Sequence, residues 1–251
     1  MAFALADLTL AQIALVAATA FGASIIGGLA GYGTGLLLPL VLAPIIGPEN
    51  VVPVISVTAL FTNVSRFLAL RTYVAWGAVA RIVPAALLPT ALGATLFAGL
   101  DARGAALVIG SALIALVPLR RILQKRGFTL TAGQLVPAGA AYGFVTGGTS
   151  GAGVILVSFL MAAGLAGPAV VATDAAISIL IGTVKAATFG FNQALPAPLL
   201  IFALLVGCAT VPGAFVAKAL LHRLPVRIHT AMLEIAILAG GAVLVWRGLA
   251  G

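Results

Sequence analysis

The chain has 251 residues, of which 63% are hydrophobic and 7% are charged, and its mean hydropathy is +1.26. A soluble surface needs several-fold more charge, so this composition excludes a soluble protein and requires lipid as the solvent. The net charge of +8 does not indicate a nucleic-acid partner, because the cations lie in short loops between apolar segments instead of on one face or in one tail.

Ten apolar segments follow one another along the chain, separated by glycine, proline and charged residues. They lie near 9–29, 33–46, 51–71, 78–99, 104–119, 133–149, 153–165, 169–189, 197–217 and 228–247. We expect all ten to be helices, because lipid satisfies no backbone hydrogen bonds and the pattern lacks the alternation of a barrel strand. The second segment of each set of five is shorter than the ~20 residues that cross a bilayer upright, so it is either a steep thin span or half of a re-entrant hairpin.

A glycine pattern repeats between the two sets of five segments. Each of its members recurs 120 positions later: Gly27, Gly28, Gly31 and Gly33 return as Gly147, Gly148, Gly151 and Gly153. The chain therefore divides into two related units, 1–119 and 133–251, joined by a basic linker at 120–132. Five segments per unit place the units in opposite orientations, so we predict an all-α polytopic membrane protein with two inverted-topology repeats.

The basic linker predicts the orientation in the membrane. Lys and Arg concentrate in the cytoplasmic loops of membrane proteins. A cytoplasmic linker brings most of the other basic residues to the same face, and both termini are then expected to lie outside the cytoplasm.

The glycine-rich stretches between the first and second segments of each repeat carry the sharpest functional signal. Four glycines in seven positions break a helix, and the half-helix that follows directs free N–H groups and its positive end at the break, which suits an anion. Hydroxyl groups in the same stretches add donors. The predicted binding residues here are Gly31, Gly33, Thr34, Thr149, Ser150, Gly151 and Gly153. The alternative is tight helix packing through small residues.

Two cations lie inside apolar segments, where a charge costs about 2.5 to 3.5 kcal/mol at the bilayer centre. Arg66 and Lys185 occupy equivalent positions in the two repeats and approach the centre from opposite sides. They form a candidate relay for an anion that crosses the membrane. The alternative is that both side chains snorkel to the nearest interface.

Two acidic residues, Asp174 and Glu234, lie at similar depth on the cytoplasmic side. Asp174 is about 16 Å along a helix from Lys185, so Arg66 is its expected partner, and Asn63 can join the pair because it lies one turn before Arg66. Asp174 is either half of a structural ion pair or a coupling or gating group. Glu234 is expected to pair with a nearby cytoplasmic cation and is assigned to the same coupling or gating set.

In these features the chain resembles the TauE/SafE family, named for export of sulfite and sulfoacetate. The resemblance rests on the repeated glycine-rich hairpins, on Pro39 closing the first one, on helices opening with Val51-Val52 and Val170-Val171, and on the basic loop between the halves. It implies a multi-pass carrier of small anions in the inner membrane, sulfite or sulfur-containing organic acids among them. We expect export by alternating access, no cofactor, and lipid and a small anion as partners, with monomer and homodimer both left open.

One motif also fits an enzyme. Gly148-Thr149-Ser150-Gly151 matches the nucleophile signature of rhomboid-type intramembrane proteases, which need a histidine base. The only histidines, His222 and His229, belong to a cytoplasmic loop and a helix end instead of the membrane core. The first repeat has Ala30 in place of Ser150, so the glycines repeat without the serine and we do not expect an enzyme. A membrane scaffold is the third class considered.

Overall fold

The computed structural model describes residues 8–30, 33–125, 129–220 and 227–250. These residues form ten α-helices and one 3-10 helix, and they contain no strand, which confirms the all-helical prediction. The helices are α1 (Leu10–Ala30), α2 (Thr34–Ile46), α3 (Pro48–Leu70), α4 (Trp76–Ala98), α5 (Ala102–Lys125), α6 (Leu135–Gly148), α7 (Gly153–Ala162), α8 (Pro168–Phe191), α9 (Ala197–Leu220) and α10 (Arg227–Ala250), and the 3-10 helix is η2 (Arg71–Tyr73).

Helix length separates spanning helices from short ones. Within the described residues, six helices are long and apolar enough to cross a membrane: α1, α3, α4, α5, α8 and α9. By contrast α2, α6 and α7 have 13, 14 and 10 residues. At 1.5 Å per residue they measure about 15 to 21 Å, which is less than the ~30 Å hydrocarbon core of a bilayer.

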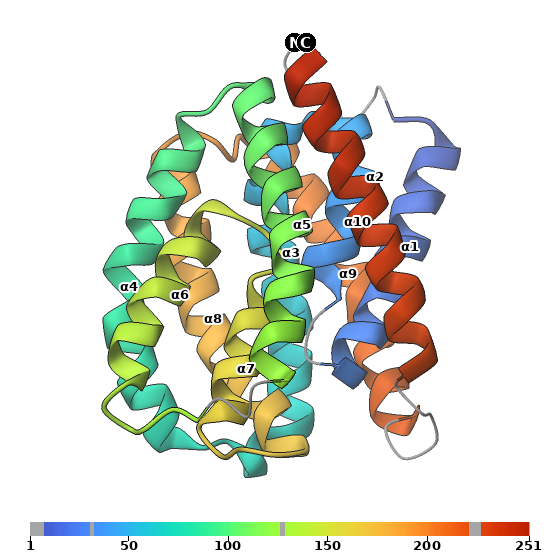
Figure 1. Cartoon of the computed structure of the whole chain (residues 1–251). Coiled ribbons are helices and arrows are strands. Elements are labelled where there is room, and N and C mark those ends of the chain that lie inside the picture. The colour runs from blue at the N-terminus through green and yellow to red at the C-terminus, as the bar shows by residue number, and fades with distance from the viewer. Residues whose placement is uncertain (1–7, 31–32, 126–128, 221–226, 251) are drawn as a thin grey trace.

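The short helices α2, α6 and α7 belong to two hairpins, α1–α2 and α6–α7, which enter the bundle from opposite ends (Figure 1). In that view α1 descends from the upper end and α2 returns to it, whereas α6 rises from the lower end and α7 returns there. In both hairpins the chain therefore returns to the end of the bundle from which it started, as expected for a short second segment. Pro39, which was expected to close the first hairpin, instead lies inside α2.

Helix pairing is similar when the two halves are exchanged. α1 packs against α9 as α6 packs against α4, and α3 packs against α9 as α8 packs against α4. The contacts that α2 makes with α1 and α3 correspond to the contacts that α7 makes with α6 and α8. The pairs α3–α8 and α5–α10 join equivalent helices directly. Two copies related by a two-fold axis would give this pattern.

Both halves also begin with the same hydrogen-bonded motif, Thr-x-x-Gln. Before α1 the backbone N–H of Thr9 donates to Gln12 Oε1 over 2.9 Å, and before α6 the N–H of Thr131 donates to Gln134 Oε1 over the same distance. This is the reaching-back contact of a capping box, in which a side chain satisfies an N–H group at a helix start. The motif repeats at a shift of 122 residues and adds to the evidence for duplication.

The two central helices are α3 and α8. Within their apolar windows 67% and 56% of the residues are buried inside the protein, against 28% to 44% for the other spanning helices. Each begins with a proline at its first turn, Pro48 and Pro168, because proline lacks only an N–H that has no partner there. The predicted start at 51 was therefore three residues late. The predicted end of the fifth segment at 119 was also early, since α5 continues through Arg120 and Arg121 to Lys125.

A stripe of small residues holds α6 against α4. Glycines at four-residue spacing lie directly over the backbone of α4, with Gly139 next to Ile82, Gly143 next to Ala86 and Gly147 next to Thr90. A Cβ atom at Gly139 would lie 2.9 Å from the carbonyl oxygen of Ile82, which is too close. Small residues at this spacing let membrane helices approach closely. The sequence interpretation used only the last of these glycines.

We expect Gly143→Ala to lower the free energy of unfolding by about 1 to 3 kcal/mol, the usual cost of overpacking. The added methyl group would collide with the Ala86 carbonyl oxygen, which belongs to a rigid helix backbone. Unfolding of the purified protein in detergent, followed by circular dichroism, measures the change. Gly190→Ala is the matched control, because no atom lies within 4 Å of a Cβ placed there. Equal stability of the two variants would contradict the packing interpretation.

Candidate functional site

The helix is interrupted in both hairpins, as predicted from the glycines. The first break separates Ala30 from Thr34 and the second separates Gly148 from Gly153. The earliest backbone bonds of the returning helices are from the N–H of Leu36 to Gly33, over 3.1 Å, and from that of Val154 to Gly151, over 3.3 Å. The N–H groups just before these positions have no acceptor within their own helix, as at any helix start. Both returning helices thus direct donors at the centre of the bundle.

The two hairpin tips touch each other through their backbones. A Cβ atom at Gly35 would lie 2.6 Å from the backbone nitrogen of Gly151 and 2.9 Å from its Cα. Gly151 itself has φ +84°, a left-handed conformation that glycine adopts without strain. Only glycine at both positions allows this contact. Gly151 belongs to the repeated pattern, whereas Gly35 does not, since Ile155 stands at its counterpart.

A cavity of about 100 Å³ lies beside this contact, between the tips and the helices α3, α6 and α8. Ten of the twelve predicted site residues line it: Gly33, Thr34, Asn63, Arg66, Thr149, Ser150, Gly151, Gly153, Asp174 and Lys185. Gly31 lies outside the described residues, and so does the side chain of Glu234 on α10. Residues far apart in the sequence are therefore brought to one place.

The central helices contribute one face each to the cavity, at the same helical spacing. From α3 the lining residues include Ile55, Ala59, Asn63 and Arg66, and from α8 they include Asp174, Ser178, Gly182 and Lys185. The two sets correspond position by position at a shift of 119 residues. Steps of four, four and three residues keep the side chains on one face of a helix. The equivalent positions carry different groups, so the cavity is chemically asymmetric.

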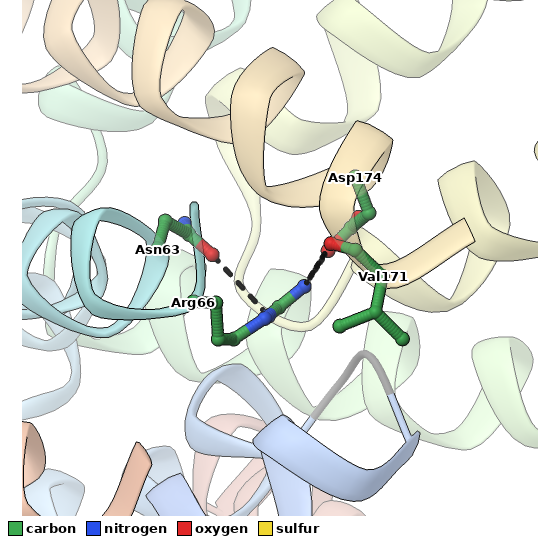
Figure 2. Close-up of polar contacts among 4 residues, drawn as sticks. All are labelled: Asn63, Arg66, Val171 and Asp174. Carbon is green, nitrogen blue, oxygen red and sulfur yellow. Dashed lines mark hydrogen bonds and ion pairs between the residues drawn. The ribbon is translucent and has the colours of Figure 1, made fainter. Parts of the chain in front are cut away.

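Arg66 joins the two halves through a buried polar cluster (Figure 2). Its guanidinium donates to the carboxylate of Asp174 and forms an ion pair with it, and it also donates to Asn63 Oδ1 over 3.3 Å and to the Val171 carbonyl over 3.4 Å. The ion-paired side chains of Arg66 and Asp174 are 6% and 2% exposed. The predicted pairing with Asp174 and Asn63 is present, and Arg66 does not snorkel to an interface.

Lys185 has a different environment although it is the counterpart of Arg66. Its ammonium group donates to the carbonyl oxygens of Thr146 and Thr149, over 2.7 and 2.6 Å, and lies 6.0 Å from the centre of the Phe189 ring. These carbonyls belong to the end of α6, where the helix break leaves acceptors without intrahelical donors. Lys185 therefore caps the interrupted helix and fixes the second tip.

The predicted hydroxyl donors differ in their availability. Thr149 donates its hydroxyl proton to the Val145 carbonyl over 2.7 Å, so that proton stays within the helix end. Ser150 Oγ is buried and has no hydrogen-bond partner among the described residues, and the same is true of Asp174 Oδ1. Buried polar atoms are normally paired, so these two atoms are exceptional among the polar groups around the cavity. Of Thr149 and Ser150, only Ser150 therefore keeps a hydroxyl proton that is not donated within the helix end.

Several polar lining residues were missed from the sequence: Ser56, Tyr142, Thr146 and Ser178. Ser178 follows Asp174 by four residues and lies on the same face of α8, so helical spacing from Asp174 to Lys185 would have found it. Thr146 immediately precedes the duplicated glycine pair. For Tyr142 the signal was its place one residue before Gly143, within the small-residue stripe.

A bundle of apolar helices that encloses a charged cavity between two helix breaks defines a polytopic membrane protein with an internal polar site. The chain belongs to the TauE/SafE sulfite exporter family, which it matches over residues 16–244. This family consists of membrane transporters that export sulfite and related anions. No curated protein and no solved structure is significantly similar to the chain.

Proposed function

We propose that the chain carries small anions across the inner membrane and that the cavity between the hairpin tips is its substrate site. The observation that carries the proposal is the convergence of Arg66, Lys185 and the unpartnered Ser150 on one buried cavity beside the starts of α2 and α7. Helix starts bind anions through free N–H groups and the positive end of the dipole. Charges buried in a membrane protein are costly and mark substrate pathways.

The transport mechanism that we propose is alternating access between two inverted repeats. Exchange of the halves preserves most helix pairs, and the repeated Thr-x-x-Gln motif and glycine breaks support a common origin. Rocking of one repeat against the other would open the cavity to each side in turn. The basic end of α5 and the linker after it favour the cytoplasm, which leaves both termini outside.

Export is the direction that we propose. A membrane potential of 100 mV, negative inside, favours the exit of one negative charge by about 2.3 kcal/mol, so an anion can leave without another energy source. Asp174 lies in the ion pair that connects α3 and α8. We assign it to gating, because opening the cavity between these helices requires this pair to separate.

Anion flux from liposomes tests the proposal. Purified protein reconstituted with internal sulfite should release it well above the rate of protein-free liposomes. Ser150→Ala should slow the release roughly tenfold, because a lost ligand hydrogen bond is worth about 1 to 1.5 kcal/mol. Ser111→Ala is the matched control, since Ser111 is exposed on α5 and bonds only within its own helix.

Two results would contradict transport. Folded protein that releases neither sulfite, nor sulfonates, nor carboxylates is not an anion carrier. Cleavage of a membrane peptide by the purified protein, abolished by Ser150→Ala, would favour the protease reading of the Gly148–Gly151 motif instead.

A further inference from the structure

We propose that Lys185 takes up one proton when an anion enters the cavity and releases it when the anion leaves, so that one proton crosses the membrane with each anion. The proposal rests on the proposed function, because it specifies how transport is coupled at that substrate site. Three features carry it: the acceptors of the Lys185 nitrogen, the burial of this nitrogen, and the charges around the cavity.

The Lys185 nitrogen has two oxygen acceptors among the described residues. They are the carbonyl oxygens of Thr146 and Thr149, at 2.7 and 2.6 Å. A neutral amine offers two N–H groups, so these bonds satisfy it completely, whereas an ammonium group has a third N–H group to place. Lys185 lines the cavity, and we assign the third N–H group to a bound anion.

Burial disfavours a charge on Lys185 while the cavity is empty. The residue is 7% exposed, and a buried cation is costly unless a counter-charge lies next to it. Of the described residues that line the cavity, the one carboxylate is that of Asp174, which is already paired with Arg66. Asp174 also precedes Lys185 by eleven residues, or about 16 Å along α8. An anion in the cavity would supply the missing counter-charge.

Helix ends change this balance little. The end of α6 attracts an ammonium group at Lys185, whereas the starts of α2 and α7, which also meet at the cavity, oppose it. Each end is equivalent to about half an elementary charge, so these contributions offset one another. The ligand is therefore the group that decides the charge of Lys185.

Few other groups near Lys185 can bind or release a proton. Those that share the described cavity lining with it are Arg66 of α3, Asp174 of α8 and Tyr142 of α6. The lining residues from α2, α7 and the hairpin tips are glycine, alanine, serine and threonine. Elsewhere on the described elements packed against α8, Glu49 lies in the first turn of α3 beside Gly47, outside the lining, and the side chains of α4 and η2 that carry such groups are exposed: Arg71, Tyr73 and Arg81.

The proton balance of one transport cycle follows from these states. In the empty carrier the amine is neutral and bonds to the two carbonyls. When an anion enters, a proton from the water of the open compartment binds to the lone pair of the amine, and the ammonium group offsets one negative charge of the ligand. Proton and anion leave together on the other side. A dianion such as sulfite still moves one net negative charge outward, so the membrane potential favours its export.

Proton uptake on anion binding tests the proposal directly. Methanesulfonate is the probe, because it has no titratable proton near neutral pH. It is added to the purified protein in weakly buffered detergent with a pH-indicator dye, and calorimetry at the same pH gives the amount bound. Between about pH 6 and pH 9 the uptake should reach a maximum close to one proton per bound anion.

Linkage adds a second measurement on the same samples. Because a proton and the anion bind together, the affinity of the wild type for methanesulfonate should fall by about tenfold per pH unit wherever the empty carrier holds a neutral amine. Lys185→Arg keeps its proton at every pH, so this variant should bind methanesulfonate with constant affinity and take up no proton. Arg81→Met, which removes an exposed cation, is the control and should behave as the wild type.

Lys185→Gln provides a second variant if Lys185→Arg does not yield folded protein. Its amide can donate to the two carbonyls but takes up no proton in this pH range. Undiminished proton uptake in either variant overturns the inference, because the proton then binds elsewhere. Binding of methanesulfonate to the wild type without proton uptake and with constant affinity also overturns it, and leaves anion transport standing. Absence of binding to the wild type, together with absence of flux from liposomes, overturns the proposed function itself.

Discussion

Replacement of Arg66 by methionine is expected to lower the free energy of unfolding by about 3 to 5 kcal/mol, because it removes one partner of a buried ion pair and leaves the other charge uncompensated. The partner is Asp174, whose side chain is 2% exposed and whose second oxygen already lacks a hydrogen bond among the described residues. Asn63 and the Val171 carbonyl would lose a donor as well. Unfolding in a denaturing detergent, monitored by circular dichroism, measures the loss.

The double variant Arg66→Met with Asp174→Asn separates the ion pair from simple side-chain packing. Neutral residues of similar volume in place of both partners often restore stability, so the double variant should be more stable than Arg66→Met alone. Arg81→Met serves as the control, because Arg81 is exposed and bonds only to Gly77 in its own helix. If Arg66→Met were as stable as Arg81→Met, the ion pair would contribute nothing to holding α3 against α8.

Gly35→Ala is expected to slow anion transport roughly five- to 160-fold, which corresponds to the 1 to 3 kcal/mol that overpacking typically costs. The new Cβ would lie 2.6 Å from the Gly151 backbone nitrogen, and no side-chain rotation can relieve a contact with backbone. The two hairpin tips would have to separate, and the donors at the starts of α2 and α7 would move with them. Flux of sulfite from liposomes gives the rate.

Gly22→Ala is the matched control for this experiment. Gly22 lies in α1, in the same hairpin as Gly35, but a Cβ placed there meets no atom within 4 Å. Transport by Gly22→Ala should equal that of the wild type at equal amounts of protein in the membrane. A normal rate for Gly35→Ala would show that the tip contact lies outside the transport path.

The membrane class, the helical fold and the hairpin breaks were predictable from the sequence because they depend on local physical rules. Lipid demands helices whatever the packing, and clustered glycines weaken a helix whatever surrounds it. The boundaries were less accurate where a rule was overlooked, as at Pro48 and Pro168, which begin α3 and α8 instead of separating segments. At the end of α5 the charged residues were taken for a loop, although the helix extends to Lys125.

The candidate site was predictable to the extent that it is duplicated or charged. Arg66, Lys185 and Asp174 stood out because charges are rare in apolar segments, and the glycines stood out because they recur. Ser178 and Tyr142 are neither charged nor duplicated, so only their places relative to Asp174 and Gly143 could have pointed to them. The partners of Lys185 were beyond prediction, because they are backbone carbonyls exposed only where α6 ends.

The two equivalent cations have different partners, so the two halves of the bundle are not interchangeable at the cavity. Arg66 bridges to the opposite repeat, whereas Lys185 bonds to the hairpin of its own repeat. In the proposed alternating-access mechanism, the movement that opens the cavity to one compartment breaks different contacts from the movement that opens it to the other. Loading and unloading should consequently follow different rate constants, so influx and efflux measured on sided vesicles should show distinct half-saturation concentrations for the same solute.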